Sequence, residues 1–337
     1  MIQKVMRGVA LAPMIAILVM VISCNQQRKQ YFKNSGVVWT TEYHIKYEAQ
    51  RDLNDSIQKL FDEIDKSVSA FNKQSLITAI NENRSDVADA YFVRLFNKAI
   101  EVNSASDGVY DPTVMPLVNA WGFGYKKGAL PTKEQIDSLL QFVGLSHVRL
   151  EGSKVVKDDP RVQFDFSSIA KGMACDAIAE MLERNGAENY MVEIGGEVVA
   201  HGVNDAGKTW HISIDMPEPD DINGAVHKSA LVINLDNLAV ATSGNYRKFK
   251  EVEGKKVSHI VNPKTGESES SALLSVSVVA SDCMSADAWA TACMAMGDKK
   301  TQLMMENNTK LGVMIICSDA EGNFVVWSNK RFADLVE

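Results

Sequence analysis

Four stretches of the chain repeat apolar residues at the three-to-four-residue spacing of an amphipathic helix. The clearest begins at Leu53 and carries Ile57, Phe61, Ile64 and Val68 on one face. Start and stop signals mark others, such as an N-capping threonine with an acidic residue two positions later and an Asn-Gly pair at a helix end. The predicted helices, with a further one near the C-terminus, cover residues 53–69, 87–104, 132–140, 169–184 and 285–296.

The second half of the chain is rich in short runs of β-branched and apolar residues between polar turns, a pattern typical of strands. The expected strands cover residues 36–47, 190–199, 210–215, 230–234, 238–242, 257–261, 274–280, 313–317 and 323–327. Strands and helices do not alternate one for one. The pattern therefore predicts an α+β fold with antiparallel sheets rather than a doubly wound parallel sheet.

The first 24 residues differ from the rest. Lys4 and Arg7 give a positive start, residues 9–22 form an apolar run too short for a typical membrane-spanning helix, and Cys24 follows. This order indicates a signal peptide, and the Val-Ile-Ser-Cys sequence resembles a bacterial lipobox, in which the cysteine is lipidated and begins the mature chain. The alternative is an ordinary signal peptide with a chance cysteine. We expect residues 1–23 to be a lipoprotein signal peptide, 24–35 a tether and 36–337 the folded part of an exported protein anchored to a bacterial membrane on the periplasmic side.

Composition narrows the classes of function. Hydrophobic residues make up 46% of the chain, which allows a full core, and the formal net charge is −8 at pH 7. Without the leader, 33 basic residues face 43 acidic ones, and this acidic balance argues against a nucleic-acid partner. The cysteines after the leader show no CxxC spacing, so no zinc site is predicted. Buried free thiols are the default expectation, with a Cys283–Cys293 disulfide as the alternative.

Two loops have compositions that suit ligand binding. Residues 107–124 combine two prolines and three glycines with aromatic residues, and Tyr110 and Asp111 lie in this stretch. Such loops are expensive to order and often bind something, although a structural turn is equally consistent. In the second loop, Asp165 and Ser168 precede a predicted helix whose first turn carries Lys171. Free backbone N–H groups and this positive charge suit phosphate, whereas the plain alternative is a helix cap with a solvated lysine.

Three further motifs carry candidate chemistry. The pair Gly195-Gly196 within residues 193–197 allows close approach of a ligand or a second backbone, although a plain bulge is the simpler interpretation. The turn containing Ser243 and Gly244 is rich in hydroxyls and donors. It is followed by His259, which can act as a base near neutral pH, although a lone histidine is more often structural.

Asp282, Asp287 and Thr291 form the last motif. Asp287 and Thr291 are four residues apart and share one face of the predicted helix. A carboxylate and a hydroxyl on one face can hold a hard cation such as Mg²⁺, with phosphate and water completing its ligands. The alternative is a dipole-stabilising aspartate with a core threonine.

In this order, the motifs resemble those of the ApbE family, the FAD:protein FMN transferases. The resemblance extends from residue 36 to about residue 297, and six motifs in sequence make a chance match very unlikely. They are Tyr110-Asp-Pro-Thr, Ile169-Ala-Lys-Gly, Ile194-Gly-Gly-Glu, Ala241-Thr-Ser-Gly-Asn-Tyr, His259-Ile-Val-Asn-Pro-Lys-Thr-Gly and Ala286-Asp-Ala-Trp-Ala-Thr.

The resemblance implies two interlocked α+β lobes, like a duplicated T-fold, with FAD between them. It implies Mg²⁺ bound by the backbone carbonyl of Ser168 and the side chains of Asp287 and Thr291. The implied FAD-binding residues are Trp39, Thr40, Thr41, Tyr110, Asp111, Asp165, Lys171, Ser243, Gly244, His259 and Ile260. The chain departs from the family's usual Met-Gly-Thr at Trp39-Thr40-Thr41 and has Ser167-Ser168 where small glycine-containing pairs are usual. A backbone carbonyl ligand survives the second change.

The implied reaction is attack by a Thr or Ser hydroxyl of a partner protein on the FMN-side phosphorus of FAD, with release of AMP. Mg²⁺ and Lys171 would neutralise charge on the pyrophosphate, and His259 is the expected base, with Asp287 as the alternative. The resemblance suggests acceptors in membrane redox complexes. Two alternatives remain, namely FAD hydrolysis to FMN and AMP at the same site and a lipoprotein that binds FAD without catalysis.

Overall fold

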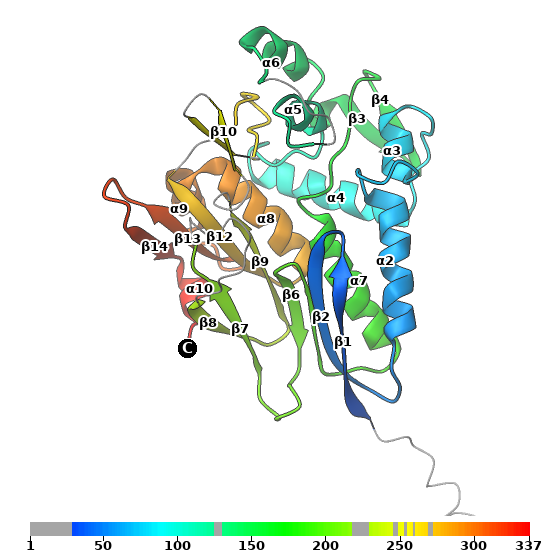
Figure 1. Cartoon of the computed structure of the whole chain (residues 1–337), viewed down its shortest axis with the longest axis vertical. Coiled ribbons are helices and arrows are strands. Elements are labelled where there is room, and N and C mark those ends of the chain that lie inside the picture. Colours follow the sequence, from blue (N-terminus) through cyan, green and yellow to red (C-terminus); the bar gives the residue numbers. More distant parts are fainter. Residues whose placement is uncertain are drawn as a thin grey trace, which may run out of the picture.

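An eight-stranded sheet in which every neighbouring pair is antiparallel forms the centre of the fold (Figure 1). The computed structural model describes residues 29–124, 130–217, 229–244, 249–252, 255–258, 260–268 and 272–337. In their order across the sheet, the strands are β1 (Gln30–Val38), β2 (Thr41–Ala49), β5 (Tyr190–Ile194), β6 (Glu197–His201), β9 (Leu238–Gly244), β12 (Leu273–Ala280), β13 (Gly312–Ser318) and β14 (Phe324–Ser328). The predicted α+β class with antiparallel sheets is confirmed.

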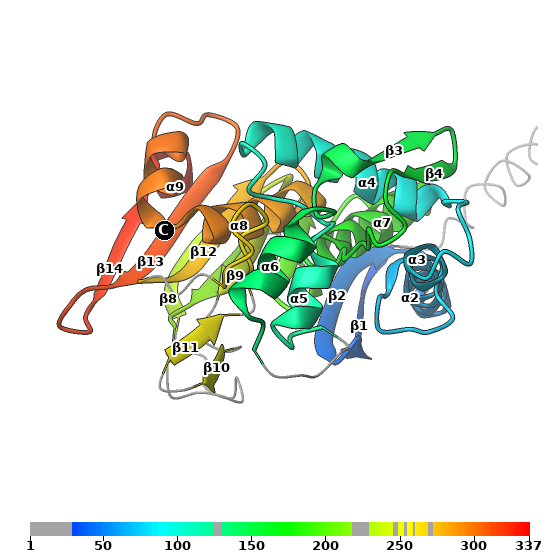
Figure 2. The same cartoon turned by 90° about the horizontal axis from the view of Figure 1, so that it is seen from above.

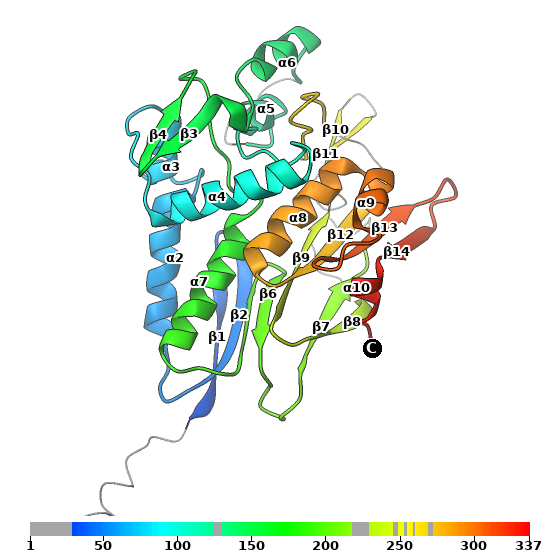
Figure 3. The same cartoon turned by 180° about the vertical axis from the view of Figure 1, so that it is seen from behind.

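The sheet is covered on both faces. The helices α2 (Asn54–Val68), α4 (Ala90–Ala105), α7 (Ala170–Arg184), α8 (Cys283–Met296) and α9 (Asp298–Met305) lie together on one face, as Figure 3 shows. The ribbon of β7 (Trp210–Asp215) and β8 (Ser229–Leu235) and the short helix α10 (Lys330–Ala333) pack on the other. Central strands are therefore apolar on both sides, as adjacent Val278 and Val279 illustrate by joining the clusters on opposite faces.

Smaller elements lie at one end of the molecule, toward the top of Figure 1 and facing the viewer in Figure 2. They are α3 (Leu76–Asn81), α5 (Met115–Ala120), α6 (Lys133–Leu140), the 3-10 turn η1 (Leu145–His147) and the hairpins β3 (Val148–Glu151) with β4 (Lys154–Lys157) and β10 (Phe249–Val252) with β11 (Lys255–Ser258). Helix α6 begins as predicted, because Thr132 and Gln135 form a capping box.

The fold repeats one order of elements. Strands β1 and β2, helix α7 and strands β5 and β6 form the first half of the sheet, and β9, β12, α8, β13 and β14 form the second half in the same strand–strand–helix–strand–strand order. The halves join where β6 pairs with β9, from Val198 opposite Val240 to Ala200 opposite Leu238. The lobes that the resemblance implies thus take the form of two halves of one continuous sheet.

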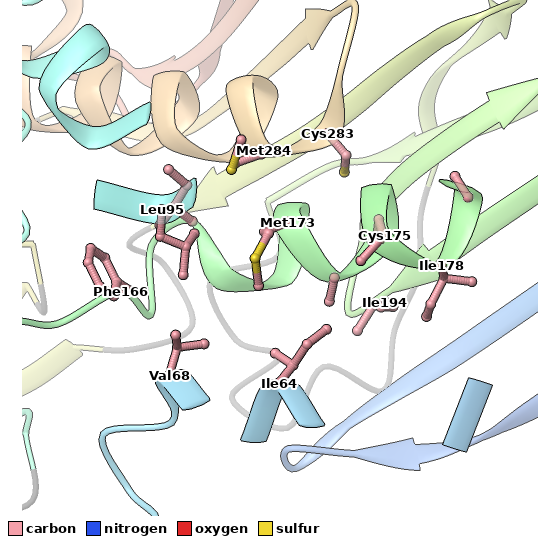
Figure 4. Packing of buried hydrophobic residues seen from close by; sticks show 14 of the residues in the cluster. Ile64, Val68, Leu95, Phe166, Met173, Cys175, Ile178, Ile194, Cys283 and Met284 are labelled. Atoms are coloured by element: carbon pink, nitrogen blue, oxygen red, sulfur yellow. The ribbon is translucent and has the colours of Figure 1, made fainter. Parts of the chain in front are cut away.

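Helices α7 and α8 cross closely in the buried layer between the two halves. Figure 4 shows Met173 and Cys175 of α7 near Cys283 and Met284 of α8, with Ile64 of α2 on the other side of α7. The crossing is close at Gly172, where an added Cβ would lie 2.4 Å from the backbone oxygen of Cys283 and 2.8 Å from Cβ of Asp287. A side chain at position 172 would therefore force the two helices apart. 

Several predicted boundaries were wrong. The single strand expected over 36–47 is the β1–β2 hairpin, which turns at Trp39 and Thr40, and β1 already begins at Gln30, inside the expected tether 24–35. The backbone of 30–38 pairs with β2 along its whole length, so this part is held in the sheet rather than free. The strand expected over 190–199 is likewise the β5–β6 hairpin, turned by Gly195 and Gly196.

Further predictions concern the cysteines, the strand expected over 257–261 and the leader. Cys175, Cys283, Cys293 and Cys317 are free thiols, so the alternative disulfide between Cys283 and Cys293 does not form. The strand expected over 257–261 overlaps β11 only at its start, because the chain turns back and Val261 forms a bridge with Ser268. The leader and Cys24 lie outside the described residues, and none of the helices within the described ranges has the length and apolar character needed to cross a membrane.

The β1–β2 turn stores backbone strain. Trp39 and Thr40 have φ angles of 50° and 66°, in the left-handed region that β-branched residues disfavour, and Thr40 is exposed. We predict that Thr40→Gly raises the free energy of unfolding by about 1 kcal/mol, since glycine adopts this conformation without the Cβ clash. Urea denaturation measures the change. Thr41→Gly, on the neighbouring strand residue, is the control and should lower stability, and equal effects of the two variants would contradict the strain argument.

Candidate active site

Two of the predicted loops meet at the start of α7. The backbone N–H of Asp165 donates to the carbonyl of Pro112 over 2.7 Å, and the Ser168 hydroxyl donates to the Tyr110 hydroxyl over 3.1 Å. Tyr110 is buried, and burial raises the pKa of its hydroxyl above the usual range, so it remains a neutral phenol. The aromatic loop and the expected phosphate-binding helix start are therefore one site.

Asp111 holds the loop rather than reaching out of it. Its Oδ1 accepts from the N–H and the hydroxyl of Thr113, and its Oδ2 accepts from the N–H of Leu145 over 2.9 Å. The Thr113 hydroxyl in turn accepts from the N–H of Gly144. With both carboxylate oxygens engaged inside the protein, the contribution of Asp111 to a ligand site is to fix the position of Tyr110.

The helix α8 joins the site through Asp287. Its Oδ2 accepts from the backbone N–H of Gly172 over 3.0 Å, and the side chain is buried. One turn along α8, the Thr291 hydroxyl lies 3.3 Å from the hydroxyl of Ser243 at the end of β9. The predicted shared face of Asp287 and Thr291 is confirmed, and it brings together the first turn of α7 and the end of β9.

This arrangement supplies the donor set of a hard cation. In the first turn of a helix the N–H of Gly172 would ordinarily bond the carbonyl four residues earlier, that of Ser168, but it donates to Asp287 instead. Within the described ranges the Ser168 carbonyl accepts no hydrogen bond. A carbonyl, the Asp287 carboxylate and the Thr291 hydroxyl are the oxygen ligands that Mg²⁺ takes in proteins, so these residues fit such an ion.

Lys171, in the same helical turn as Gly172, makes an ion pair with a buried carboxylate of the sheet. Its Nζ lies 2.6 Å from Oε1 of Glu197, the first residue of β6. Burial on its own would lower the pKa of the Lys171 ammonium, but the carboxylates of Asp287 and Glu197 outweigh that effect and raise it above the usual range. Lys171 therefore carries its positive charge at any physiological pH.

In the first half of the sheet, the turns of the β1–β2 and β5–β6 hairpins lie side by side. Glycine is required at position 195 because a Cβ there would lie 2.7 Å from Oγ1 of Thr41, and φ is 62°. The Gly195 N–H also donates to the carbonyl of Glu42. Trp39 packs edge-on against Phe61 of α2, with the ring centroids 5.5 Å apart. Trp39, Thr40 and Thr41 therefore stand beside the turn that leads into Glu197.

The structure describes some of the remaining predicted site residues but not all of them. Ile260 is buried in the cluster that includes α8, and the segment after it is fastened by the Trp121 indole N–H, which donates to the carbonyl of Gly266 over 2.8 Å. Gly244 ends β9 next to Ser243. His259, the expected base, lies outside the described residues.

A surface hollow elsewhere contains none of these side chains. It is lined by residues of α3, the segment after it and β4, including Arg84 and Lys157. Lys157 Nζ donates to the carbonyl of Ile80, near the end of α3, which gives this lysine a capping role. The hollow is therefore separate from the candidate active site.

Two important residues were missed from the sequence. Glu197 stands in the 193–197 motif without a predicted role, although a charged residue at the start of an apolar strand is a signal. Asp176 belongs to none of the predicted motifs, and it is buried with its two oxygens accepting the N–H groups of Cys283 and Met284 over 2.8 and 2.9 Å. Together with the N-cap Asp282, it anchors the start of α8 against α7.

Comparison with known proteins agrees with this site. The model of the ApbE family matches residues 39–315. A protein of Vibrio cholerae named FAD:protein FMN transferase is 34% identical over 316 residues, which cover 90% of this chain and 93% of that protein. One of the same name from Haemophilus influenzae is 33% identical and covers 96% of both chains. The chain therefore belongs to the ApbE family.

Solved structures show the same fold. The Vibrio cholerae flavin transferase ApbE superposes with a TM-score of 0.80 at 33% identity and covers 91% of this chain and 99% of that one. The apo form of the Pseudomonas stutzeri flavinyl transferase ApbE gives 0.81 at 27% identity, covering 92% and 98%. The predicted family and its α+β fold are thus confirmed.

Asp176 makes stability depend on pH. Burial raises the pKa of its carboxyl to about 7, against the lowering effect of the Met284 and Cys283 N–H groups. Between about pH 4 and pH 7 the folded protein thus binds more protons than the unfolded chain, so this group's contribution to stability falls as pH rises. We predict that Asp176→Asn flattens this fall, which urea midpoints across pH 4.5–7.5 measure.

The control for this prediction is Asp282→Asn, at the more exposed cap of the same helix. Asparagine is an equally good N-cap, and the Asp282 carboxylate contributes to the raised pKa of Asp176, so the Asp282 variant should keep the fall in stability but move its upper end to lower pH. An unchanged profile in the Asp176 variant would contradict the assignment.

Proposed function

We propose that this chain transfers FMN from FAD to a Thr or Ser hydroxyl of an acceptor protein and releases AMP. The observation that supports this most is the convergence of Ser168, Lys171, Asp287 and Thr291 at the start of α7. A helix start with a lysine and a cation-binding donor set is suited to a pyrophosphate. The names of the relatives, FAD:protein FMN transferase, support FAD as the flavin donor and a protein as the acceptor.

In this reaction one oxygen–phosphorus bond forms and one breaks. The hydroxyl oxygen of the acceptor attacks the phosphorus of the FMN half of FAD, and the anhydride bond to the AMP half breaks. The hydroxyl proton leaves to a base, and AMP departs as a phosphate monoester. The product is FMN joined to the acceptor by a phosphoester.

Asp287, Thr291 and the Ser168 carbonyl would hold Mg²⁺, which supplies positive charge to the pyrophosphate as its anhydride bond breaks. Lys171, in the first turn of α7, adds a second, permanent positive charge. Tyr110 stays neutral and fixes Ser168 through the hydroxyl contact. The part of these residues is to orient the two phosphates and to stabilise the charge that develops.

The proton acceptor in this proposal is His259, since an imidazole has the appropriate basicity near neutral pH. Asp287 is the alternative if the metal does not engage both of its oxygens. The acceptor protein is proposed to be a subunit of a membrane redox complex.

We also propose that the chain is exported and anchored through a lipid on Cys24, which would place the enzyme beside membrane acceptors on the periplasmic side. The motif at the end of the apolar leader supports this. Membrane fractionation of a Cys24→Ser variant tests it, because the variant should lose its membrane association. Retention of the variant in the membrane would overturn the anchor.

The activity is tested by incubating the purified protein with FAD, Mg²⁺ and a candidate acceptor and measuring the intact mass of the acceptor. We expect one added FMN, and release of AMP. Free FMN and AMP without modification of the acceptor would identify a hydrolase, and unchanged FAD would identify a carrier.

Asp287→Asn should lower FMN transfer at least ~100-fold, and EDTA should abolish transfer by the wild type, because a neutral amide is a poor ligand for Mg²⁺. The fold should survive, since the asparagine oxygen can still accept from Gly172. Asp282→Asn on the same helix is the matched control and should transfer FMN normally. In the same assay, transfer that persists in His259→Ala but not in the Asp287 variant would show that His259 is not the base.

A further inference from the structure

The side chain of Glu197 is held rigidly at a position where a buried carboxylate adds little to the stability of the fold. It is 3% exposed and follows directly on the Gly195-Gly196 turn. Its backbone carbonyl accepts from the Cys175 thiol over 3.3 Å, which ties the start of β6 to α7. Its Oε1 receives the Lys171 ammonium at 2.6 Å, whereas its buried Oε2 has no hydrogen-bond partner among the described residues.

An ion pair whose carboxylate is buried with one oxygen unpartnered among the described residues is a poor stabiliser of the fold. Removing a charge from water is unfavourable, and the attraction between the paired charges offsets this only when all hydrogen-bonding groups are satisfied. An apolar pair of similar volume would serve the core equally well. The Lys171–Glu197 pair therefore calls for an explanation beyond packing.

The two partners differ in exposure. The side chain of Glu197 is 5% exposed and that of Lys171 is 31% exposed, so the pair reaches from a buried anchor outward. An ammonium has three N–H donors, and Glu197 takes one of them. No other acceptor for Lys171 occurs in the described part of the chain, which leaves two donors for a ligand.

The direction in which those donors point is set by the backbone on both sides. Lys171 adjoins Gly172, whose N–H is bound to Asp287, so its Cα is fixed relative to the cation-binding residues. The position of Glu197 is fixed by the Gly195-Gly196 turn, which packs against Thr41. A long flexible lysine side chain loses its freedom when its head group is tethered in this way, and the loss precedes ligand binding.

We infer that Glu197 is a positioning residue that holds the Lys171 ammonium in place, so that its two remaining N–H donors face the pyrophosphate of FAD. The inference rests on the proposed function in that it takes FAD as the anionic ligand. Glu197 does not touch FAD, and it acts through Lys171 alone. Its removal should therefore have an effect only while Lys171 is present.

A double-mutant cycle on the full-length protein in detergent tests this. The variants are Glu197→Gln, Lys171→Met and the two combined, and each is measured for its FAD dissociation constant in Mg²⁺ buffer by flavin fluorescence and for its kcat/KM in FMN transfer. Glutamine keeps the shape of Glu197, and the combined variant buries no unpaired charge, which preserves the fold. Glu193→Gln, in the preceding strand of the same hairpin, is the matched control, because Glu193 accepts from Gly196 but pairs with His44 instead of the lysine.

We expect Glu197→Gln to weaken FAD binding and lower kcat/KM by ~10-fold to 100-fold, as for other residues that orient a ligand-binding group. The combined variant should match Lys171→Met within about threefold, which would be strong coupling between the two sites. Glu193→Gln should stay within about twofold of the wild type. Melting temperatures report separately on the fold.

Three results would overturn the inference. They are a Glu197→Gln variant that binds FAD within about twofold of the wild type, effects of the two substitutions that multiply in the combined variant, and an equal loss in Glu193→Gln. The proposed function fails separately, if the wild type binds FAD with the expected coupling but never modifies an acceptor.

Discussion

The close crossing of α7 and α8 at Gly172 is the constraint on which the site depends. With no Cβ at that position, the two helices approach until the Gly172 N–H bonds the Asp287 carboxylate. That one hydrogen bond turns an N–H away from the Ser168 carbonyl, orients Asp287 and sets Thr291 against the end of β9. Helix packing and the chemistry of the site are thus produced by the same contact, because interiors are too tightly packed to shift one without the other.

The distribution of buried charge follows from that crossing. Asp287 and Glu197 lie near Lys171, whose ammonium compensates for them in part, whereas Asp176 is compensated by the N–H groups that open α8. An excess of negative charge around one lysine is unfavourable in a closed core. The same excess is favourable at a site built to receive a divalent cation together with an anionic ligand, since the cation completes the balance.

The sequence predicted those parts of the molecule whose signals are local. Helix α7 could be predicted from the apolar spacing of residues 169–184 and its Asn-Gly end, and the Asp287–Thr291 face follows from helical spacing alone. The β1–β2 turn was missed because Trp39 and Thr40 are not turn residues, and the left-handed conformation they adopt is imposed by the surrounding sheet. Glu197 was missed because its partner is 26 residues earlier in the chain, and no local pattern reports a pairing between a strand and a helix start. Six ordered motifs supplied the family, which residue chemistry alone could not reach.

The repeat within the sheet has a consequence for how the molecule behaves as a whole. Ser168 and Lys171 belong to the first strand–strand–helix–strand–strand unit, while Ser243, Asp287 and Thr291 belong to the second. The candidate active site therefore lies at the seam of an internal pseudo-dimer, comparable to a subunit interface in which each copy contributes different groups. Neither unit possesses the site by itself, and a ligand bound across the seam would be linked to the association of the two units as a partner is linked to an oligomer. Divergence after such a duplication can give one copy the side chains that bind the cation and the other copy the lysine, which a symmetric pair could not do.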